Sequence, residues 1–339
     1  MVTIRINTPQ SAMKQFLHGL WTFAVLSLGS IATAQTWPDR PVRVIVASVP
    51  GGTIDVSVRT LTTKLAERFK QPFVIDNRGG AGGIIAAEAV AASTGDGYTL
   101  LGGSIADQVI NVFIRRNSNQ ALRYDPDRDF IPVALIERGG NVLVAHPSLP
   151  ANTIPELITL AKAKPGTISF GSGGVGQTTH LSGELFKKAA GIDLLHVPYR
   201  GNAPAAADLL AGTVKLLFES PVSAEQNVRA GKVKALAVTT QTRLPGLPEV
   251  PTFVEFGLPD VVVTPYILLL APTGTPPAVV QALNKATIEI MTGPDSRAAA
   301  RALLGWSTPA WSPAQVKEFI ATDRKRWESV IMGSNIRSD

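Results

Sequence analysis

The sequence predicts an α/β protein built of two series of alternating strands and helices. Residues 42–48, VRVIVAS, form a nearly continuous β-branched run, which is typical of a strand buried on both faces. Apolar residues then recur at spacings of three and four from Ile54 to Phe69, which predicts a helix with one buried face. The same order restarts after about residue 140, so we expect two lobes with parallel sheets and right-handed crossovers.

The first series contains two further predicted strands. FVID at 73–76 precedes the turn RGGAGG, after which a helix is expected over 84–93. GDGYTLLGG at 95–103 supplies another turn and the third strand. The first series is therefore three strands, each associated with a glycine-containing turn.

The second series opens with the predicted strand NVLVAHP at 141–147. Thr153 and Glu156 form a capping box with Pro155 just inside, so a helix is predicted to run to Lys164. The elements predicted after it are strands in TISF, LLHVPY, VKLLFES and VKALAVT with helices near 178–190, 202–211 and 223–230, then the strand YILLLAP at 266–272 and helices at about 276–291 and from Ser312 onward.

Residues 1–34 differ in composition from the rest of the chain. Arg5 and Lys14 are their only Lys or Arg residues, and Phe16 to Ile31 is a run without charge. The sequence ATAQ follows, which fits a small-x-small cleavage site before Gln35. We therefore expect residues 1–34 to be a secretory signal peptide and not a membrane anchor.

Composition excludes several classes of protein. The 339 residues are 45% apolar and 17% charged, which suits a globular chain with a substantial core. Cysteine is absent, so disulfides and thiolate metal sites are excluded, and no cluster of other metal ligands is visible. The formal net charge is +6, but the basic residues are scattered, so nucleic acid is not an expected partner.

Two glycine-rich loops are the main candidates for a binding site. SVPGGTID contains Gly51 and Gly52, and GSGGVGQTTH ends at His180. Both are expected at the carboxyl ends of strands, where open α/β sheets bind ligands. The unpaired amides of each following helix can bind an anion, although an ordinary tight turn is the alternative interpretation. We expect backbone amides to hold the ligand, helped by the side chains of Thr53, Ser104, Ser172 and Thr178.

The second loop also contains the pattern G-x-G-x-x-G, at Gly171, Gly173 and Gly176. Asp193 follows about twenty residues later, but it precedes the next strand instead of ending it, so an NAD enzyme is not expected. Neither loop has the G-K-[ST] ending of a P-loop, and H-E-x-x-H and G-x-S-x-G are absent. We therefore expect no cofactor and no catalytic residues.

Two histidines near these loops have different expected roles. His196 lies inside an apolar strand, which is typical of a core histidine with a hydrogen-bond partner. His180 lies in the first turn of the helix after the second loop. Both a contact with a ligand and a local packing role remain open for His180.

From about Trp37 to the C-terminus, the chain resembles the tripartite tricarboxylate transporter solute receptors, the Bug family of periplasmic binding proteins. Ten stretches carry this resemblance in the order that the family has them. They are WPDRPVRVIV, PGGTIDV, VIDNRGGAGG, GDGYTLL, YDPDRDFIPVALI, GVGQTTHL, HVPYRGNAPAAADLLAG, GKVKALAVT, LPEVPTFVEFGLP and LLAPTGTP.

The resemblance implies a two-lobed periplasmic-binding-protein fold of type II, the Venus flytrap, with two doubly wound sheets joined by two crossovers. Residues 36–137 and 258–339 would then form the first lobe, and residues 138–257 the second. A monomer in the periplasm is expected, with its ligand between the lobes.

The resemblance also implies a set of ligand-binding residues. These are Gly51, Gly52, Thr53, Asp55, Ser104, Ser172, Gly174, Val175, Gly176, Gln177, Thr178, His180, Glu219 and Ser220. The sequence departs from the family at Ser48, where an aromatic residue is frequent, at Gly80, where proline is usual, and at Glu219-Ser220, where Asp-Asn is common. The first and last departures lie near the expected cleft and concern the identity of the ligand.

The function implied by the resemblance is that of a receptor, not an enzyme. Such a receptor captures a small organic anion, an amino acid or a related metabolite and delivers it to the subunits of a membrane permease. The alternatives are a receptor that serves a signalling partner and, on the same scaffold, a secreted enzyme.

Overall fold

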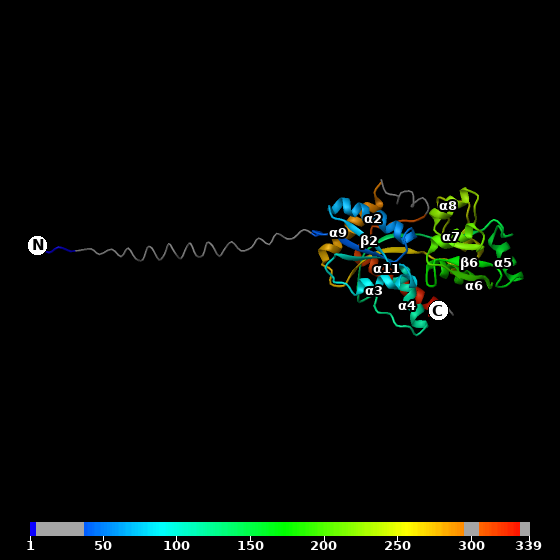
Figure 1. The fold of residues 1–339 in the computed structure, drawn as a ribbon, viewed down its shortest axis with the longest axis horizontal. Coiled ribbons are helices and arrows are strands. Elements are labelled where there is room, and N and C mark those ends of the chain that lie inside the picture. Colours follow the sequence, from blue (N-terminus) through cyan, green and yellow to red (C-terminus); the bar gives the residue numbers. More distant parts are fainter. Residues whose placement is uncertain (5–36, 295–304, 333–339) are drawn as a thin grey trace. The chain divides into compact units, whose positions relative to one another are not determined.

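The computed structural model describes residues 1–4, 37–294 and 305–332. Met1–Asp39 and Arg40–Asp339 form separate compact units, and the fold described below is that of the second (Figure 1). Residues 5–34 of the predicted signal peptide lie outside the described residues. None of the helices in the described ranges combines the length and the apolar character needed to cross a membrane.

The first sheet has five strands in the order β2-β1-β3-β10-β4. Its strands are β1 (Val42–Val46), β2 (Phe73–Asn77), β3 (Thr99–Ser104), β4 (Phe130–Arg138) and β10 (Tyr266–Pro272). The predicted strands at 42–48, 73–76, 95–103 and 266–272 are confirmed, whereas β4 was not predicted. β1 pairs in parallel with β2 and β3, and β10 is inserted between β3 and β4.

The second sheet also has five strands, in the order β7-β6-β8-β5-β9. Its strands are β5 (Val142–Ala145), β6 (Ser169–Ser172), β7 (Leu195–Pro198), β8 (Leu216–Glu219) and β9 (Lys234–Val238). β6 pairs in parallel with β7 and β8. All five strands coincide with segments predicted from the sequence.

Each sheet contains one strand that runs against the others, so the expectation of parallel sheets is wrong at β10 and β5. The chain passes from β4 of the first sheet into β5 of the second, and returns from β9 to β10. Most strands of each sheet end at the edge that faces the other sheet. A strand that the chain enters directly from the other sheet begins at that edge, so it must run in the opposite direction. The two crossings between the sheets therefore account for both reversed strands.

Helices follow the strands in the predicted order, with one additional helix, at 111–117, that was not predicted (Figure 1). They are α2 (Thr53–Phe69), α3 (Ile84–Ala91), α4 (Asn111–Asn117), α5 (Ile154–Ala163), α6 (Thr178–Ala190), α7 (Asn202–Leu210), α8 (Pro221–Arg229), α9 (Pro277–Thr292) and α11 (Pro313–Met332), with short helical turns η1 (Ala81–Gly83), η2 (Ala106–Ile110), η3 (Val254–Phe256) and η4 (Pro259–Val261). The predicted cap of α5 is confirmed, because the Thr153 side chain accepts a hydrogen bond from the Glu156 amide.

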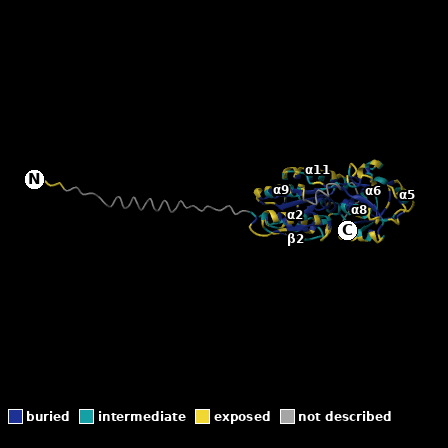
Figure 2. Cartoon of the chain, turned by 90° about the horizontal axis from the view of Figure 1, so that it is seen from above, coloured by how far each residue is buried: buried dark blue, intermediate teal, exposed yellow. Residues whose placement is uncertain are grey.

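The strands and the inner faces of the helices form the core, which is drawn in dark blue in Figure 2. α11 buries Val316, Ile320 and Trp327 in the apolar cluster beside the first sheet, as its spacing predicts. Leu181 and Leu185 of α6 belong to this cluster too, although α6 follows a strand of the second sheet. The two sheets are therefore connected by apolar packing as well as by the chain.

The lobe boundaries remain a prediction, and the sheet order supplies a test. Residues 138–257 contain every strand of the second sheet, so this fragment should fold alone. Residues 36–137 should not, because β4 pairs with β10 and would be left without a neighbour. Circular dichroism and urea unfolding of both purified fragments would check this. Cooperative unfolding of both fragments would contradict the proposed boundaries.

Candidate binding site

A cavity of about 240 Å³ lies where the two sheets face each other. Its lining comes from the segments that follow β1, β2 and β3 in the first sheet and β6, β7 and β8 in the second. Asn141 precedes β5, and Pro265 precedes Tyr266, the first residue of β10, so the reversed strands contribute their amino ends. The cavity therefore occupies the edge at which open α/β sheets bind ligands.

Eight of the fourteen residues predicted for the site line this cavity. They are Gly52, Thr53, Ser104, Gly174, Val175, Gln177, Thr178 and Ser220. The other six, which do not line it, are Gly51, Asp55, Ser172, Gly176, His180 and Glu219. Most of these six instead hold the glycine loops in shape.

Asp55 does not line the cavity but stabilises the first glycine loop. Its carboxylate accepts hydrogen bonds from the Gly51 amide at 2.9 Å, the Arg59 guanidinium at 2.7 Å and the Asn77 side chain at 2.8 Å. Burial on its own would raise the pKa of Asp55, but these hydrogen bonds and the charge of Arg59 outweigh it and lower the pKa. Asp55 is therefore an ionised residue that fixes the turn.

The second glycine loop uses most of its own amides internally. The Gly173 amide donates to Thr179 Oγ1 at 3.0 Å, and the Gly174 amide donates to Ser172 Oγ at 3.2 Å. The Gly176 amide donates to His180 Nδ1 at 3.3 Å. The loop amides that were expected to bind an anion are thus occupied at these three glycines.

His180 is in a packing arrangement in this structure, which is one of the two roles that the sequence leaves open. It is buried and stacks on His196 with ring centroids 4.2 Å apart. Burial, reinforced by the neighbouring His196 and Lys187, lowers the pKa of His180 to about 3. The ring is therefore neutral at physiological pH, and its Nδ1 is able to accept the Gly176 amide.

The side chain of Glu219 is also turned into the protein. It is buried and accepts a hydrogen bond from the Ser223 hydroxyl, and burial raises its pKa. Ser220, the next residue, lines the cavity and accepts the Ser223 amide as the N-cap of α8. Of this pair, only Ser220 is in position to contact a ligand.

The free donors at the cavity are amides at the beginnings of helices. The first amides of α2, at Thr53 and Ile54, and that of α6, at Thr178, have no hydrogen-bond partner among the described residues. α2 follows a strand of the first sheet and α6 follows a strand of the second, and the first residues of both helices line the cavity. Each helix N-terminus carries roughly half a positive charge, so the site favours an anion.

A third donor group, in the turn RGGAGG, was not recognised as part of the site from the sequence. Gly80, Ala81 and Gly82 line the cavity with φ angles of 112°, 47° and 63°. Their amides have no partner among the described residues, and successive backbone amides in a turn can form a concave site for an anion. Three glycine turns after three strands of one sheet were the signal that could have identified it.

Asn111 connects this third turn to the second glycine loop. Its side-chain amide donates to the carbonyls of Gly82 and Ala106 at 3.0 Å and of Gly176 at 3.4 Å. A Cβ atom on Gly82 or Gly176 would lie 2.2 Å or 2.0 Å from this side chain. Asn111 therefore bridges segments that follow strands of the two different sheets.

Replacing Asn111 by leucine should weaken both ligand binding and the protein. Leucine has a similar size but no donor, so two buried carbonyls, of Ala106 and Gly176, and the half-buried carbonyl of Gly82 lose a partner. We expect about tenfold weaker binding and a loss of roughly 1–3 kcal/mol in the free energy of unfolding. Calorimetry and urea unfolding measure the two quantities. Unchanged affinity in N111L would contradict a bridging role in the bound state.

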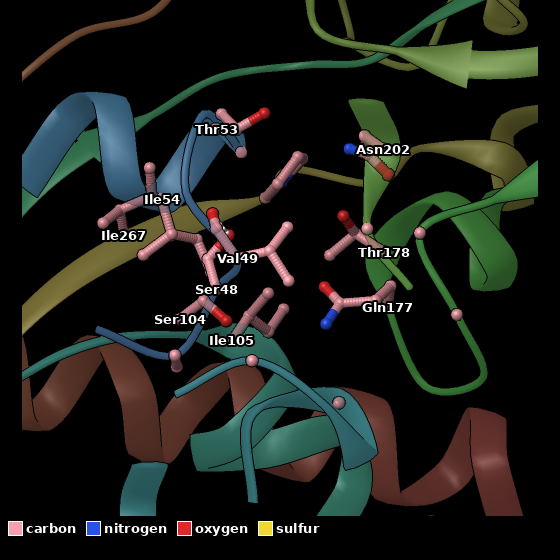
Figure 3. Close-up of a pocket in the computed structure, with 18 of the residues that line it drawn as sticks. Ser48, Val49, Thr53, Ile54, Ser104, Ile105, Gln177, Thr178, Asn202 and Ile267 are labelled. Carbon is pink, nitrogen blue, oxygen red and sulfur yellow. Dashed lines mark hydrogen bonds between the residues drawn. The ribbon is translucent and has the colours of Figure 1, made fainter. Parts of the chain in front are cut away.

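Figure 3 shows how the side chains are distributed around the cavity. Val49, Ile54, Ile105 and Ile267 lie on one side, where Ser48, Thr53 and Ser104 lie as well. The side chains of Gln177, Thr178 and Asn202 lie on the opposite side. Of the described residues that line the cavity, Arg200 is the only charged one, and its side chain is exposed.

Within the described ranges, no group of three or more His, Asp or Glu side chains is arranged to hold a metal ion. The lining also contains none of these three residue types. The chemistry of the site is therefore that of neutral donors, helix N-termini and aliphatic surface.

Comparison with known proteins relates this arrangement to receptors. The family model for the tripartite tricarboxylate transporter family receptor matches residues 57–336. Protein BugT of Bordetella pertussis is 34% identical over 91% of this chain and 93% of its own length.

Two solved structures are similar over nearly their whole length. An R. palustris protein solved with adipate has a TM-score of 0.81 and 35% identity, over 88% of this chain and 98% of that one. MatC from Rhodopseudomonas palustris, with bound malate, has a TM-score of 0.81 and 32% identity, over 87% of this chain and 100% of that one. With the family match covering most of the sequence, the chain belongs to the tripartite tricarboxylate transporter receptor family.

Proposed function

We propose that this protein is a periplasmic receptor that captures a small carboxylate between two lobes and delivers it to a membrane permease. The observation that carries the proposal is the convergence of unpaired helix N-terminal amides from both sheets on one cavity without acidic side chains. Two relatives of similar structure were solved with adipate and malate, both of which are carboxylates.

Neutral donors are sufficient for useful affinity. A micromolar dissociation constant corresponds to about 8 kcal/mol of binding free energy. Each helix terminus contributes roughly 0.3–2 kcal/mol to a bound negative charge, depending on burial. Amides of α2 and α6 together with those at Gly80, Ala81 and Gly82 supply several such contacts, and exclusion of water strengthens each of them.

A ligand screen tests the proposed function directly. The protein is unfolded, dialysed and refolded to remove bound ligand, and its melting temperature is measured with a panel of mono-, di- and tricarboxylates, amino acids and neutral analogues such as amides. We expect stabilisation by at least one carboxylate, with calorimetry giving a 1:1 stoichiometry, and none by its amide. Absence of binding across all carboxylates, or turnover of a bound one, would contradict the proposal.

Export is part of the same proposal and has its own expected result. The protein secreted to the periplasm should begin at or near Gln35, since Ala32-Thr33-Ala34 fits a signal-peptidase site. Intact-mass measurement of the periplasmic protein gives the cleavage position. Retention of residues 16–34 in a membrane fraction would contradict a freely diffusing receptor.

A further inference from the structure

We propose that the ligand is a monocarboxylate whose remaining part is uncharged and apolar, of about the size of a ring or a six-carbon chain. The inference rests on the proposed function, because it names the class of carboxylate that the same cavity takes. It distinguishes this protein from the two relatives solved with adipate and malate, which are dicarboxylates. Three properties of the cavity support it.

The first property is the absence of acidic side chains from the described lining, which disfavours an ammonium group. The neighbouring acids do not line the cavity. Asp55 is paired with Arg59, and Glu219 is buried, with one carboxylate oxygen accepting the Ser223 hydroxyl and the other, Oε2, without a partner among the described residues. Asp107, next to Ser104, accepts that residue's amide and hydroxyl and the Gln108 side chain. An amino acid would therefore bury its ammonium group without a counter-charge, which is costly.

The second property is the aliphatic side formed by Val49, Ile54, Ile105 and Ile267, which we call the aliphatic wall (Figure 3). The two serines beside it direct their hydroxyl hydrogens into the protein. Ser48 donates to the Val49 carbonyl at 3.1 Å, and Ser104 donates to Asp107 at 3.1 Å.

A second carboxylate placed against the four side chains of the aliphatic wall would lose its water to carbon and gain no hydrogen bond from the hydroxyls of Ser48 and Ser104, and an unpaired buried charge is strongly disfavoured. The unpaired amides at the beginning of α2 and at Gly80, Ala81 and Gly82 are then available to share the single carboxylate with the beginning of α6. An apolar group placed against the wall gains free energy from every Å² that it removes from water. The wall therefore selects for an uncharged end of the ligand.

The opposite side can hold one carboxylate. Gln177 and Thr178 stand at the beginning of α6, and Asn202 at the beginning of α7, so their side-chain donors and the helix amides face the cavity together. Figure 3 places these three side chains across from the aliphatic wall. A carboxylate bound here directs the rest of the molecule toward the wall.

The third property is size. A cavity of about 150 Å³ lined by aliphatic and aromatic residues is large enough to bind benzene. The cavity in this protein is about 240 Å³, which leaves room for a carboxylate beside a group of that size. Both the apolar body and the single charged group can thus be enclosed.

The test uses three six-carbon acids that differ only in their polar groups: hexanoate, adipate and norleucine. Adipate adds a second carboxylate to hexanoate, and norleucine adds an ammonium group. Calorimetry at pH 7 on ligand-free protein should give an affinity for hexanoate at least tenfold above that for either of the others. Adipate or norleucine binding as tightly as hexanoate, or more tightly, would overturn the inference and leave the proposed function intact. Failure of all carboxylates in the wider panel would instead contradict the proposed function.

A pair of variants tests the aliphatic wall itself. Ile54→Thr puts a hydroxyl into the wall while it keeps a β-branched residue in α2. Val56→Thr makes the comparable change two residues along the same helix, at a position that is 37% exposed and outside the lining. We expect I54T to lower the affinity for hexanoate at least fivefold relative to V56T and to reduce the preference over adipate. Equal effects of the two variants would overturn the assignment of the wall to the ligand's apolar part.

Discussion

Replacing Gly174 by valine should lower ligand affinity by roughly a hundredfold or more, which is about 2.8 kcal/mol. Gly174 lines the cavity with a φ of +122°, a conformation that L-residues other than glycine rarely adopt. Its Cβ atom would lie 3.0 Å from the Tyr199 carbonyl, in the segment after β7 that also lines the cavity. The substitution therefore displaces two walls of the site. Calorimetry with the best ligand from the screen measures the loss.

Gly191→Val is the matched control. Gly191 also has a positive φ, +61°, at the end of α6, but nothing lies within 4 Å of a Cβ atom there. Both variants strain the backbone, so both should lose stability, whereas only G174V should lose binding. Comparable losses of affinity in the two folded proteins would show that the effect is one of stability and not of the site.

Arg200→Ala distinguishes binding by amides from binding by a guanidinium. Arg200 is the only charged residue among the described lining, but it is exposed, and exposed charge pairs contribute about 0.2–1 kcal/mol. We therefore expect the affinity of R200A to fall about fivefold or less. A loss of a hundredfold in R200A, together with binding by a folded G174V, would assign the anion to Arg200.

Much of the fold follows from local sequence signals. Continuous β-branched runs, glycine turns and apolar spacings of three and four predict nine of the strands and the α-helices other than α4, because these signals reflect burial within a few residues. The direction of β5 and β10 does not follow from them. A run such as YILLLAP is equally apolar in either direction, and only the path of the chain between the sheets decides how it pairs.

The sequence indicated which loops lie at the cavity, but not which of their polar atoms point into it. Glycine loops at strand ends correctly indicate the edge of the sheets at which the cavity lies. They do not indicate which polar atoms the loop itself uses. Ser172 and His180, which the family resemblance assigns to the site, accept loop amides and do not line the cavity. The lining residue Trp306 lies far along the chain and has no local signal, because only the tertiary fold brings it to the cavity.

Replacing Asp107 by asparagine should remove a pH dependence of stability between about pH 4 and pH 6. Asp107 is fully buried, and burial raises its pKa from 3.8 to about 6 despite opposing hydrogen bonds from Gln108 and Ser104. The folded protein thus binds this proton more tightly than the unfolded chain does. The free energy of unfolding therefore falls as the pH rises through this interval and stays lower above it, by about 3 kcal/mol in total.

The substitution keeps the geometry while it removes the charge. The amide oxygen of the new side chain can still accept from Ser104, and the Gln108 amide can turn to present its oxygen to the new amide group. Urea unfolding from pH 4 to pH 7.5 should then show D107N gaining stability relative to the native protein as the pH rises.

Asp260→Asn, at an exposed position outside the cavity, is the control, and its difference from the native protein should be small at every pH. The quantity to compare is the difference in the free energy of unfolding between a variant and the native protein, because Asp55 changes this free energy with pH in the opposite direction. Its pKa is lowered in the folded protein, so it contributes stability at neutral pH that is lost as the pH falls. Asp55 is present in the native protein, D107N and D260N alike, so its contribution cancels. A D107N curve parallel to the native one would mean that Asp107 is ionised at no cost, and that its hydrogen bonds with Ser104 and Gln108 fully compensate its burial.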